Sequence, residues 1–331
     1  MISRRAFIGG AAATLAGSAL VLPAAGCGVP LVADSFYRPT PASPLTPQSE
    51  WYVNAYTGTR FLDASSWSLR VEGNVGRART LDMAALGRFP RRSLTMTMMC
   101  VGNLPGGGLI SSGTFEGVRL ADVLEDAKLL PSTRAVLLVG ADGFPALLET
   151  RDALGDDALL ASHLNGTPLR PNHGFPLRLV RPGRYGFRQP KWLVGIRALR
   201  RAPTVRVVNH ALDEIVDPTI GVISRIDTPR TSASAGLVPV SGIALSGRAE
   251  IARVELSVDG GAFEPATITF NRPDDDQPAR LWSLWRTEVR LGRGEHQLRV
   301  RAVDSIGRAQ PDDLAFPYPS DSIHALTISV S

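Results

Sequence analysis

The sequence of 331 residues contains only two cysteines and two lysines, and these shortages exclude several classes of protein. Cys27 and Cys100 lie far apart, so the chain has no Cys-x-x-Cys-His motif and carries no c-type haem of its own. The five histidines are scattered and offer no spacing typical of a zinc site. No Gly-x-Ser-x-Gly segment is present, which argues against an α/β-hydrolase. A redox enzyme with this sequence would need a separate electron carrier.

The charge balance also limits the choice of partner. There are 36 basic and 31 acidic residues, which gives a net charge of +5, and the arginines are scattered along the chain. Nucleic-acid-binding domains usually concentrate their basic residues, so we expect no nucleic acid partner. A local basic site for an anionic cofactor stays open, and Lys191 is of interest for it because the chain has only one other lysine, Lys128.

The N-terminus has the pattern of an export signal. Ser3-Arg4-Arg5-Ala6-Phe7-Ile8 is followed by an apolar run to Leu22 and by small residues up to Cys27. The paired arginines resemble a twin-arginine signal, whose route carries folded proteins. We therefore predict a signal peptide over residues 1–27 and a periplasmic or other extracytoplasmic location. Ala25-Gly26-Cys27 also resembles a lipoprotein cleavage box, so a lipid anchor at Cys27 that tethers the protein to a membrane stays open.

The rest of the chain divides into a linker and two domains with different patterns. Residues 28–48 are rich in Pro, Thr and Ser and predict a tether. Residues 49–205 mix strand and helix patterns and predict an α+β domain. The expected strands are 67–73, 94–99, 135–140, 176–180 and 191–199, and the expected helices begin at Thr80 and Val118.

Residues 217–331 show no long helical pattern. Short alternating runs follow one another, separated by Gly, Pro and Asp turns, and they predict an all-β immunoglobulin-like sandwich. The expected strands begin near residues 222, 240, 252, 282, 296 and 324.

Cys100 is the residue with the most chemical interest. It ends the apolar run that begins at Leu94, and after removal of the signal it is the only cysteine of the chain. A single thiol of an exported protein is either a buried core residue or a working thiolate. The residue type alone leaves both readings open.

The surroundings of Cys100 resemble the sulfite oxidase family of molybdopterin-dependent oxidoreductases. The family pattern Cys-x-Gly-Asn matches Cys100 to Asn103, and a glycine-containing stretch before a helix matches 113–120. The strongest match is His173 to Trp192, and residues 282–311 resemble the family's dimerisation domain. The resemblance covers nearly the whole mature chain in order. It implies a molybdopterin-binding domain followed by an immunoglobulin-like dimerisation domain, with a homodimer expected.

The resemblance also implies roles for individual residues. Cys100 would be the catalytic and metal residue that ligates molybdenum, and a soft thiolate suits such a metal. Molybdopterin carries a phosphate, which guanidinium, ammonium and backbone N–H groups recognise. The residues implied to bind the cofactor are Asn54, His173, Arg178, Gly186, Phe187, Arg188 and Lys191.

The sequence departs from the family where substrate is bound. Sulfite-oxidising members carry an arginine directly after Cys-x-Gly-Asn, whereas this chain has Leu104-Pro105. Loss of a charge-assisted hydrogen bond to an oxyanion costs about 1.5–3 kcal/mol, which disfavours sulfite and makes a neutral substrate such as a sulfoxide credible. Gly106-Gly107-Gly108 then predicts a pliable loop beside the thiol.

Two hypotheses follow from different classes of protein. The first is an exported oxidoreductase that transfers an oxygen atom to or from a small substrate at molybdenum and exchanges electrons with an external carrier such as a cytochrome. The second is a cofactor-free binding or scaffold protein that retains the fold. The retained cysteine and the 173–191 stretch favour the enzyme. The sequence leaves the substrate, the direction of transfer and the electron partner open.

Overall fold

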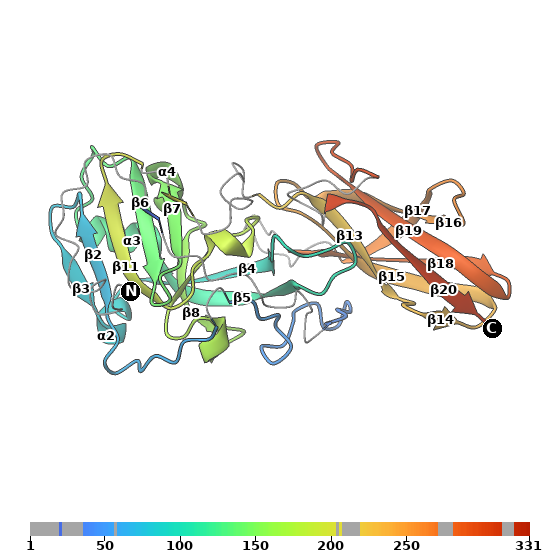
Figure 1. The fold of residues 1–331 in the computed structure, drawn as a ribbon, viewed down its shortest axis with the longest axis horizontal. Coiled ribbons are helices and arrows are strands. Elements are labelled where there is room, and N and C mark those ends of the chain that lie inside the picture. The colour runs from blue at the N-terminus through green and yellow to red at the C-terminus, as the bar shows by residue number, and fades with distance from the viewer. Residues whose placement is uncertain are drawn as a thin grey trace.

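Two bodies, joined end to end, make an elongated molecule (Figure 1). The computed structural model describes residues 20–21, 36–55, 58–202, 205–206, 219–270, 281–312 and 321–331. Apart from residues 20–21, the predicted signal peptide lies outside the described residues, as do residues 28–35 of the predicted linker. Strand β1 (Leu20–Val21) pairs in parallel with β12 (Val205–Arg206). None of the helices in the described part of the chain is long and apolar enough to cross a membrane.

The first sheet of the N-terminal domain carries Cys100 at one end. Its strands follow the order β10 (Arg178–Val180), β8 (Leu159–Leu164), β5 (Ile110–Arg119) and β4 (Arg91–Met99), and all neighbours are antiparallel. The short strand β9 (Thr167–Pro168) pairs with β8. Figure 1 shows β4 and β5 running from this domain toward the C-terminal body. Cys100 follows β4 directly, and its neighbours Met99 and Val101 pack with residues of the C-terminal body.

The second sheet lies on the far side of the same domain. Its order is β3 (Arg79–Leu81), β2 (Leu69–Gly73), β11 (Leu193–Leu199), β6 (Ala135–Gly140) and β7 (Pro145–Glu149), with β2 and β11 parallel. The helices are short: α2 (Met83–Leu86), α3 (Leu120–Asp126) and α4 (Thr150–Ala153), with 3₁₀ turns η1 (Pro171–His173) and η2 (Gly186–Arg188). Apolar residues of both sheets and of α3 form one buried core. The predicted α+β class is confirmed.

The structure corrects two predicted helix starts and adds several strands that were not predicted, β5 being the longest of them. Thr80 lies in β3, and α2 is capped instead by Asp82, whose Oδ1 accepts a hydrogen bond from the Ala85 amide at 2.7 Å. Val118 belongs to β5, and α3 begins two residues later. The sequence did not predict β5 because glycines interrupt its pattern. A Cβ at Gly117 would overlap the backbone of Leu160 in β8, so the glycine permits this close strand pairing.

The C-terminal body is the predicted sandwich. One layer contains β13 (Val222–Thr228), β15 (Gly236–Ser246) and β18 (Ser283–Leu291), and the other contains β16 (Ile251–Val258), β19 (Gly294–Asp304), β20 (His324–Val330) and β14 (Ser232–Ala233). Strand β17 (Glu264–Phe270) pairs with both β16 and β18 and so joins the layers. The sequence analysis missed β17, whose Pro265 weakens the strand pattern.

The two bodies share an apolar interface at the end of β4. Trp282 is fully buried there, and its backbone N–H donates to Thr97 Oγ1 at 2.8 Å. Its indole Nε1–H donates to the Pro44 carbonyl at 2.8 Å, which ties the N-terminal segment to the same place. Thr46 is also buried, and its N–H donates to the Ser112 carbonyl at 2.7 Å. Residues 36–48 of the predicted linker are therefore packed against the protein, contrary to the expectation of a free tether.

Candidate active site

Cys100 is the first residue of the loop that connects β4 to β5. Its N–H donates to the Leu109 carbonyl at 3.0 Å, and its own carbonyl accepts from the Asn103 N–H at 3.1 Å. The side chain is partly exposed. Asn54 Nδ2 donates a hydrogen bond to Cys100 Sγ at 3.2 Å. The thiol is therefore neither sealed in the core nor remote from polar groups, and a donor to sulfur favours the thiolate over the thiol.

Lys191 holds Asn54 in this position. Its Nζ donates to the backbone carbonyls of Asn54 at 2.8 Å and Asn172 at 2.7 Å. The pKa of Lys191 is lowered to about 7, mainly by burial and also by the charge of Arg178, although Asp142 and Cys100 act in the opposite direction. Lys191 thus contacts Asn54, and Asn54 contacts the thiol. The ammonium group of Lys191 would attract an anion that binds beside Cys100.

Arg178 is a buried cation without an acidic partner. Its side chain is enclosed, with the residue 2% exposed. Nη1 donates to the His173 carbonyl at 3.0 Å, and Nη2 contacts the Gln189 carbonyl at 3.3 Å and Met98 Sδ at 3.2 Å. No carboxylate of the described residues forms an ion pair with it. Burial lowers the pKa of Arg178 to about 10, so the fold keeps an expensive charge at this point.

His173 packs beside this arginine and is neutral. Its Nε2 lies 3.1 Å from the Gln48 carbonyl oxygen, which accepts a hydrogen bond when the ring proton is on Nε2. Burial is the main cause that lowers the pKa of His173 to about 4. The ring also makes an edge contact with Trp51, at 6.5 Å between centroids. His173 therefore orders the loop between η1 and β10 and adds no charge at neutral pH.

The turn η2 brings the last three predicted residues close to the end of β4. A Cβ on Gly186 would lie 3.1 Å from the Tyr52 hydroxyl and 3.5 Å from the Met99 carbonyl. The guanidinium of Arg188 lies 5.0 Å above the Phe187 ring, and both residues are partly exposed. The structure thus brings Asn54 to the thiol and Lys191 to Asn54, and it places Gly186 beside Met99 at the end of β4. Their role in binding a cofactor stays a prediction.

Three findings were missed by the sequence analysis. Tyr52 is buried, and burial raises the pKa of its hydroxyl well above its ordinary value, with the charge of Cys100 adding to the effect. Asn172 has a buried Oδ1 with no hydrogen-bond partner among the described residues. The hydrogen bond from the Asn54 side-chain amide to Cys100 Sγ was also not predicted, while the predicted contact of Asn54 with pterin stays a prediction. Tyr52 lies two residues before Asn54, and this proximity to a predicted site residue is the signal that could have found it.

This donor set fits an anionic cofactor that carries a thiophilic metal. The buried cation Arg178 and the partly buried cation Lys191 lie near a partly exposed thiol, and neither cation forms an ion pair among the described residues. A bound phosphate or other anion would offset their burial. The free Oδ1 of Asn172 offers an acceptor to a ring N–H. The residues present therefore fit the molybdenum cofactor that the sequence implies.

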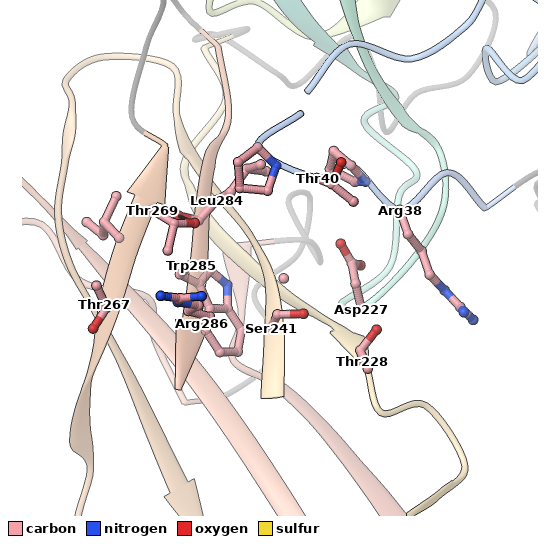
Figure 2. A pocket seen from close by; sticks show the side chains of 14 residues that line it. Arg38, Thr40, Asp227, Thr228, Ser241, Thr267, Thr269, Leu284, Trp285 and Arg286 are labelled. Atoms are coloured by element: carbon pink, nitrogen blue, oxygen red, sulfur yellow. Dashed lines mark hydrogen bonds between the residues drawn. The ribbon is translucent and has the colours of Figure 1, made fainter. Parts of the chain in front are cut away.

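A separate cavity of about 580 Å³ lies between the N-terminal segment and the sandwich (Figure 2). Arg38, Asp227 and Thr228 lie on one side of it, and Thr267 and Thr269 lie on the other. Cys100 does not line it.

Comparisons with known proteins point to one family. A family model described as "Oxidoreductase molybdopterin binding domain" matches residues 56–205, and one described as "Mo-co oxidoreductase dimerisation domain" matches residues 219–318. The chain is 31% identical to the sulfite oxidase of Gallus gallus, with 82% of this chain and 69% of that protein covered. It is 29% identical to the mitochondrial sulfite oxidase of Homo sapiens, with 82% and 58% covered.

A solved structure agrees with these relatives. The sulfane dehydrogenase SoxCD from Paracoccus pantotrophus superposes with a TM-score of 0.76 at 25% identity, covering 87% of this chain and 84% of that chain. The chain spans little more than half the length of most of the curated sulfite oxidases it matches, for example 58% of the mouse enzyme.

Proposed function

The chain belongs to the sulfite oxidase family of molybdopterin-dependent oxidoreductases, and from this premise we propose that Cys100 ligates molybdenum in an oxygen-atom transfer to or from a small substrate. The observation that carries the proposal is the position of the Cys100 thiol, which receives a hydrogen bond from Asn54 and lies close to Lys191. A thiolate is the ligand that a soft, redox-active metal prefers. A cofactor-free scaffold would have no use for the buried cation Arg178, which forms no ion pair among the described residues.

When bound, the cofactor supplies the two-electron redox centre, and the residues of this chain prepare its surroundings. Asn54 stabilises the charge on Cys100 Sγ by donating to it. Arg178 and Lys191 hold positive charge where the anionic groups of the cofactor would lie. His173 keeps its proton on Nε2 against the Gln48 carbonyl and fixes the loop that leads to Arg178. Partial exposure of Cys100 leaves room for a small substrate.

We propose a neutral substrate rather than sulfite. Leu104 stands where sulfite-oxidising members carry arginine, and it is 55% exposed. An exposed leucine offers no hydrogen bond to an oxyanion but tolerates a small apolar group. A sulfoxide meets this description because its single oxygen is neutral. The similar solved structure, SoxCD, is a sulfane dehydrogenase, which supports sulfur compounds as the first substrates to test.

The proposal also covers the location, the oligomeric state and the electron partner of the enzyme. The Ser-Arg-Arg-x-Phe-Ile signal supports export of the folded protein to the periplasm, where Cys27 could carry a lipid anchor. The match of residues 219–318 to a dimerisation domain supports a homodimer. Since the described chain carries no haem motif, a separate carrier such as a cytochrome would exchange its electrons.

The test is metal and pterin analysis of protein made in a host that synthesises the cofactor. We expect about one molybdenum per chain, as one thiolate and one pterin complete such a site. Cys100→Ser should abolish the molybdenum electron paramagnetic resonance signal, and an unchanged signal would refute ligation by this thiol. The enzyme loaded with cofactor is then assayed with sulfite, nitrate and a panel of sulfoxides. Separately, the mass of the mature N-terminus decides whether Cys27 is lipidated.

A further inference from the structure

The loop that follows Cys100 is held by the second domain. Residues 101–109 connect β4 to β5, and Gly106 within this loop adopts a positive φ of +74°. Three consecutive glycines have little conformational preference of their own, so the loop would sample many states if it stood alone. Inside the loop, Asn103 Oδ1 accepts the Leu109 N–H at 2.8 Å, but this contact does not reach the glycines.

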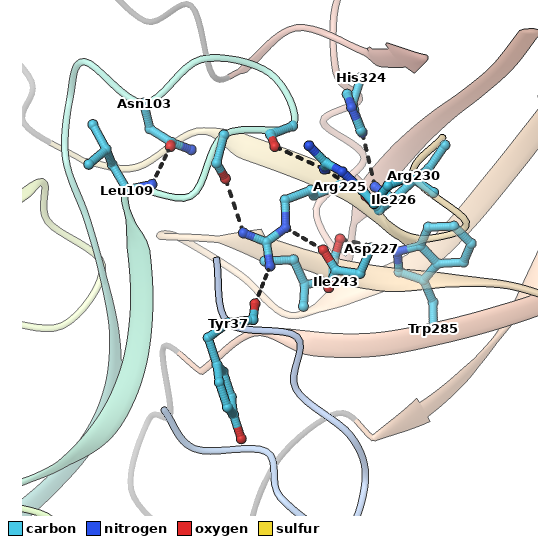
Figure 3. A network of polar contacts seen from close by, with 12 residues as sticks. Tyr37, Asn103, Leu109, Arg225, Ile226, Asp227, Arg230, Ile243, Trp285 and His324 are labelled. Carbon is cyan, nitrogen blue, oxygen red and sulfur yellow. Dashed lines mark hydrogen bonds and ion pairs between the residues drawn. The ribbon is translucent and has the colours of Figure 1, made fainter. Parts of the chain in front are cut away.

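Two arginines of the sandwich reach the glycines instead (Figure 3). Arg225 Nη1, from β13, donates to the Gly107 carbonyl at 3.0 Å. Arg230 Nη1, which follows the same strand, donates to the Gly106 carbonyl at 3.2 Å. Both are charge-assisted hydrogen bonds, which are stronger than neutral ones. Inside the loop, the Gly107 N–H donates to the Leu104 carbonyl at 2.8 Å. The second domain adds the restraint that the loop itself does not supply, on the carbonyl oxygens of Gly106 and Gly107.

Arg225 has no freedom to move. It is 2% exposed. Its Nε donates to Asp227 Oδ1 at 2.5 Å, and its Nη2 donates to the Tyr37 carbonyl at 2.9 Å. The Phe36 ring lies 4.1 Å from this guanidinium and 4.3 Å from that of Arg230. The fork of Arg225 thus joins the sandwich, the N-terminal segment and the Cys100 loop.

His324 of β20 also packs against the loop, at Gly106. A Cβ added to Gly106 would overlap its ring, so the histidine packs directly on the glycine backbone. Its Nδ1 accepts the Ile226 N–H at 3.0 Å, which orients the ring from β20. Burial is the main cause that lowers the pKa of His324 to about 4, so the ring stays neutral beside the two arginines.

We propose that Arg225 and Arg230 are positioning residues for Cys100: by holding the carbonyls of Gly106 and Gly107, they fix the direction in which the thiol meets the metal. A buried cation with one acid costs stability in comparison with an apolar residue, so its retention calls for a specific task, and here that task is the placement of a glycine loop. The inference rests on the proposed function for its catalytic consequence. The loop restraint itself does not depend on it.

The test uses the full chain in a Cys27→Ser background, both loaded and free of cofactor. The variants are Arg225→Lys, Arg225→Ala and Arg230→Ala. Lysine keeps the charge but cannot reach Asp227, Tyr37 and Gly107 together. The matched control is Arg286→Ala, because Arg286 is an exposed arginine of the same domain with no side-chain hydrogen bond or ion pair in the described structure.

Hydrogen exchange of the 101–109 peptide reports the restraint. We expect about tenfold faster exchange in the Arg225 and Arg230 variants and no change in the control, because each lost bond is charge-assisted. In loaded enzyme, the electron paramagnetic resonance spectrum should shift and kcat should fall about tenfold at unchanged KM and molybdenum content. Should Arg225→Ala fail to fold, Arg225→Lys and Arg230→Ala carry the test.

The possible results separate the two ideas. Unchanged exchange in Arg225→Lys and Arg230→Ala overturns the restraint. Faster exchange with an unchanged spectrum and unchanged kcat overturns positioning and leaves a structural role only. If the parent protein binds no molybdenum, the proposed function fails, and the rate of Cys100 alkylation in the cofactor-free chain decides the inference: a change in the arginine variants alone supports it, and equal rates in all variants overturn it.

Discussion

Asn54 Nδ2 lies 3.2 Å from Cys100 Sγ and donates a hydrogen bond to it. The same residue accepts from Lys191 Nζ through its backbone carbonyl at 2.8 Å. The amide is therefore held in place by a cation while it stabilises the sulfur. Asn54 is therefore the residue that favours the thiolate form of Cys100 in the cofactor-free chain.

Replacing Asn54 by alanine should make Cys100 less reactive in the cofactor-free chain. Loss of a hydrogen bond to a charged sulfur lowers the population of thiolate by about tenfold or more, and the higher nucleophilicity of the remaining thiolate offsets part of this. We expect alkylation by iodoacetamide at pH 7 to slow about threefold to tenfold in a Cys27→Ser background. Asn54→Gln, which keeps the amide, serves as control. Equal rates in parent and Asn54→Ala would show that the contact does not act on sulfur.

The residues of the candidate site differ in how far the sequence could predict them. Cys100 and Lys191 were predictable because each is a rare residue type in this chain and each lies in a recognisable motif. Arg178 was predictable because a charge between two leucines needs a reason. The contact of Asn54 with sulfur was not, since it joins positions 46 residues apart through a side-chain direction that no local pattern encodes.

The same limit explains what was missed in the fold. Strand β5 contains two glycines that break the alternation, and their close approach to neighbouring segments becomes visible only in three dimensions. Arg225 and Gly107 are 118 residues apart, so the sequence showed a pliable glycine loop but not the guanidinium that holds it. Residues 36–48 have the composition of a tether, yet Thr46 is buried, because tertiary contacts override composition.

Stability of the cofactor-free protein should depend on Lys191 and on pH. The pKa of this partly buried lysine is about 7 in the fold and about 10.4 in an unfolded chain, so between these values the unfolded state binds the extra proton. Stability therefore rises as the pH is raised through this window. From pH 7 to pH 9 the parent should gain about 2 kcal/mol relative to Lys191→Met, measured by urea unfolding.

An anionic cofactor should remove this dependence, because it keeps Lys191 charged. The loaded enzyme and its Lys191→Met variant should then show parallel stability profiles over the same pH window. Lys128→Met, which removes the other lysine, controls for the loss of a lysine as such. Parallel profiles in the cofactor-free proteins would mean that Lys191 is not protonated differently in the fold.

Arg178→Met should separate cofactor binding from folding. Methionine fills a similar volume, and replacing a buried unpaired charge by an apolar group is often neutral for stability. We expect the free energy of unfolding of the cofactor-free chain to change by less than about 1.5 kcal/mol, while molybdenum content falls below about a tenth of the parent's, since anion binding loses charge-assisted hydrogen bonds. Arg197→Met removes a half-exposed ion pair with Glu72 and should leave metal content unchanged. If Arg178→Met instead lowers the free energy of unfolding of the cofactor-free chain by more than about 1.5 kcal/mol, the loss of metal follows from misfolding and Arg178 belongs to the core.

The substrate pocket can be tested by restoring the missing arginine. Leu104 is 55% exposed, so a longer side chain fits without displacing core residues. In Leu104→Arg a guanidinium would offer a charge-assisted hydrogen bond to an oxyanion, worth about 1.5–3 kcal/mol, which corresponds to about a tenfold to hundredfold change in kcat/KM. We expect sulfite oxidation to rise by this factor while turnover of sulfoxides stays within about twofold of the parent, because a neutral oxygen gains much less from the charge. Leu104→Gln, which is polar but uncharged, is the matched control. An equal rise with glutamine would point to pocket shape rather than charge, and no rise in either variant would place the substrate away from residue 104.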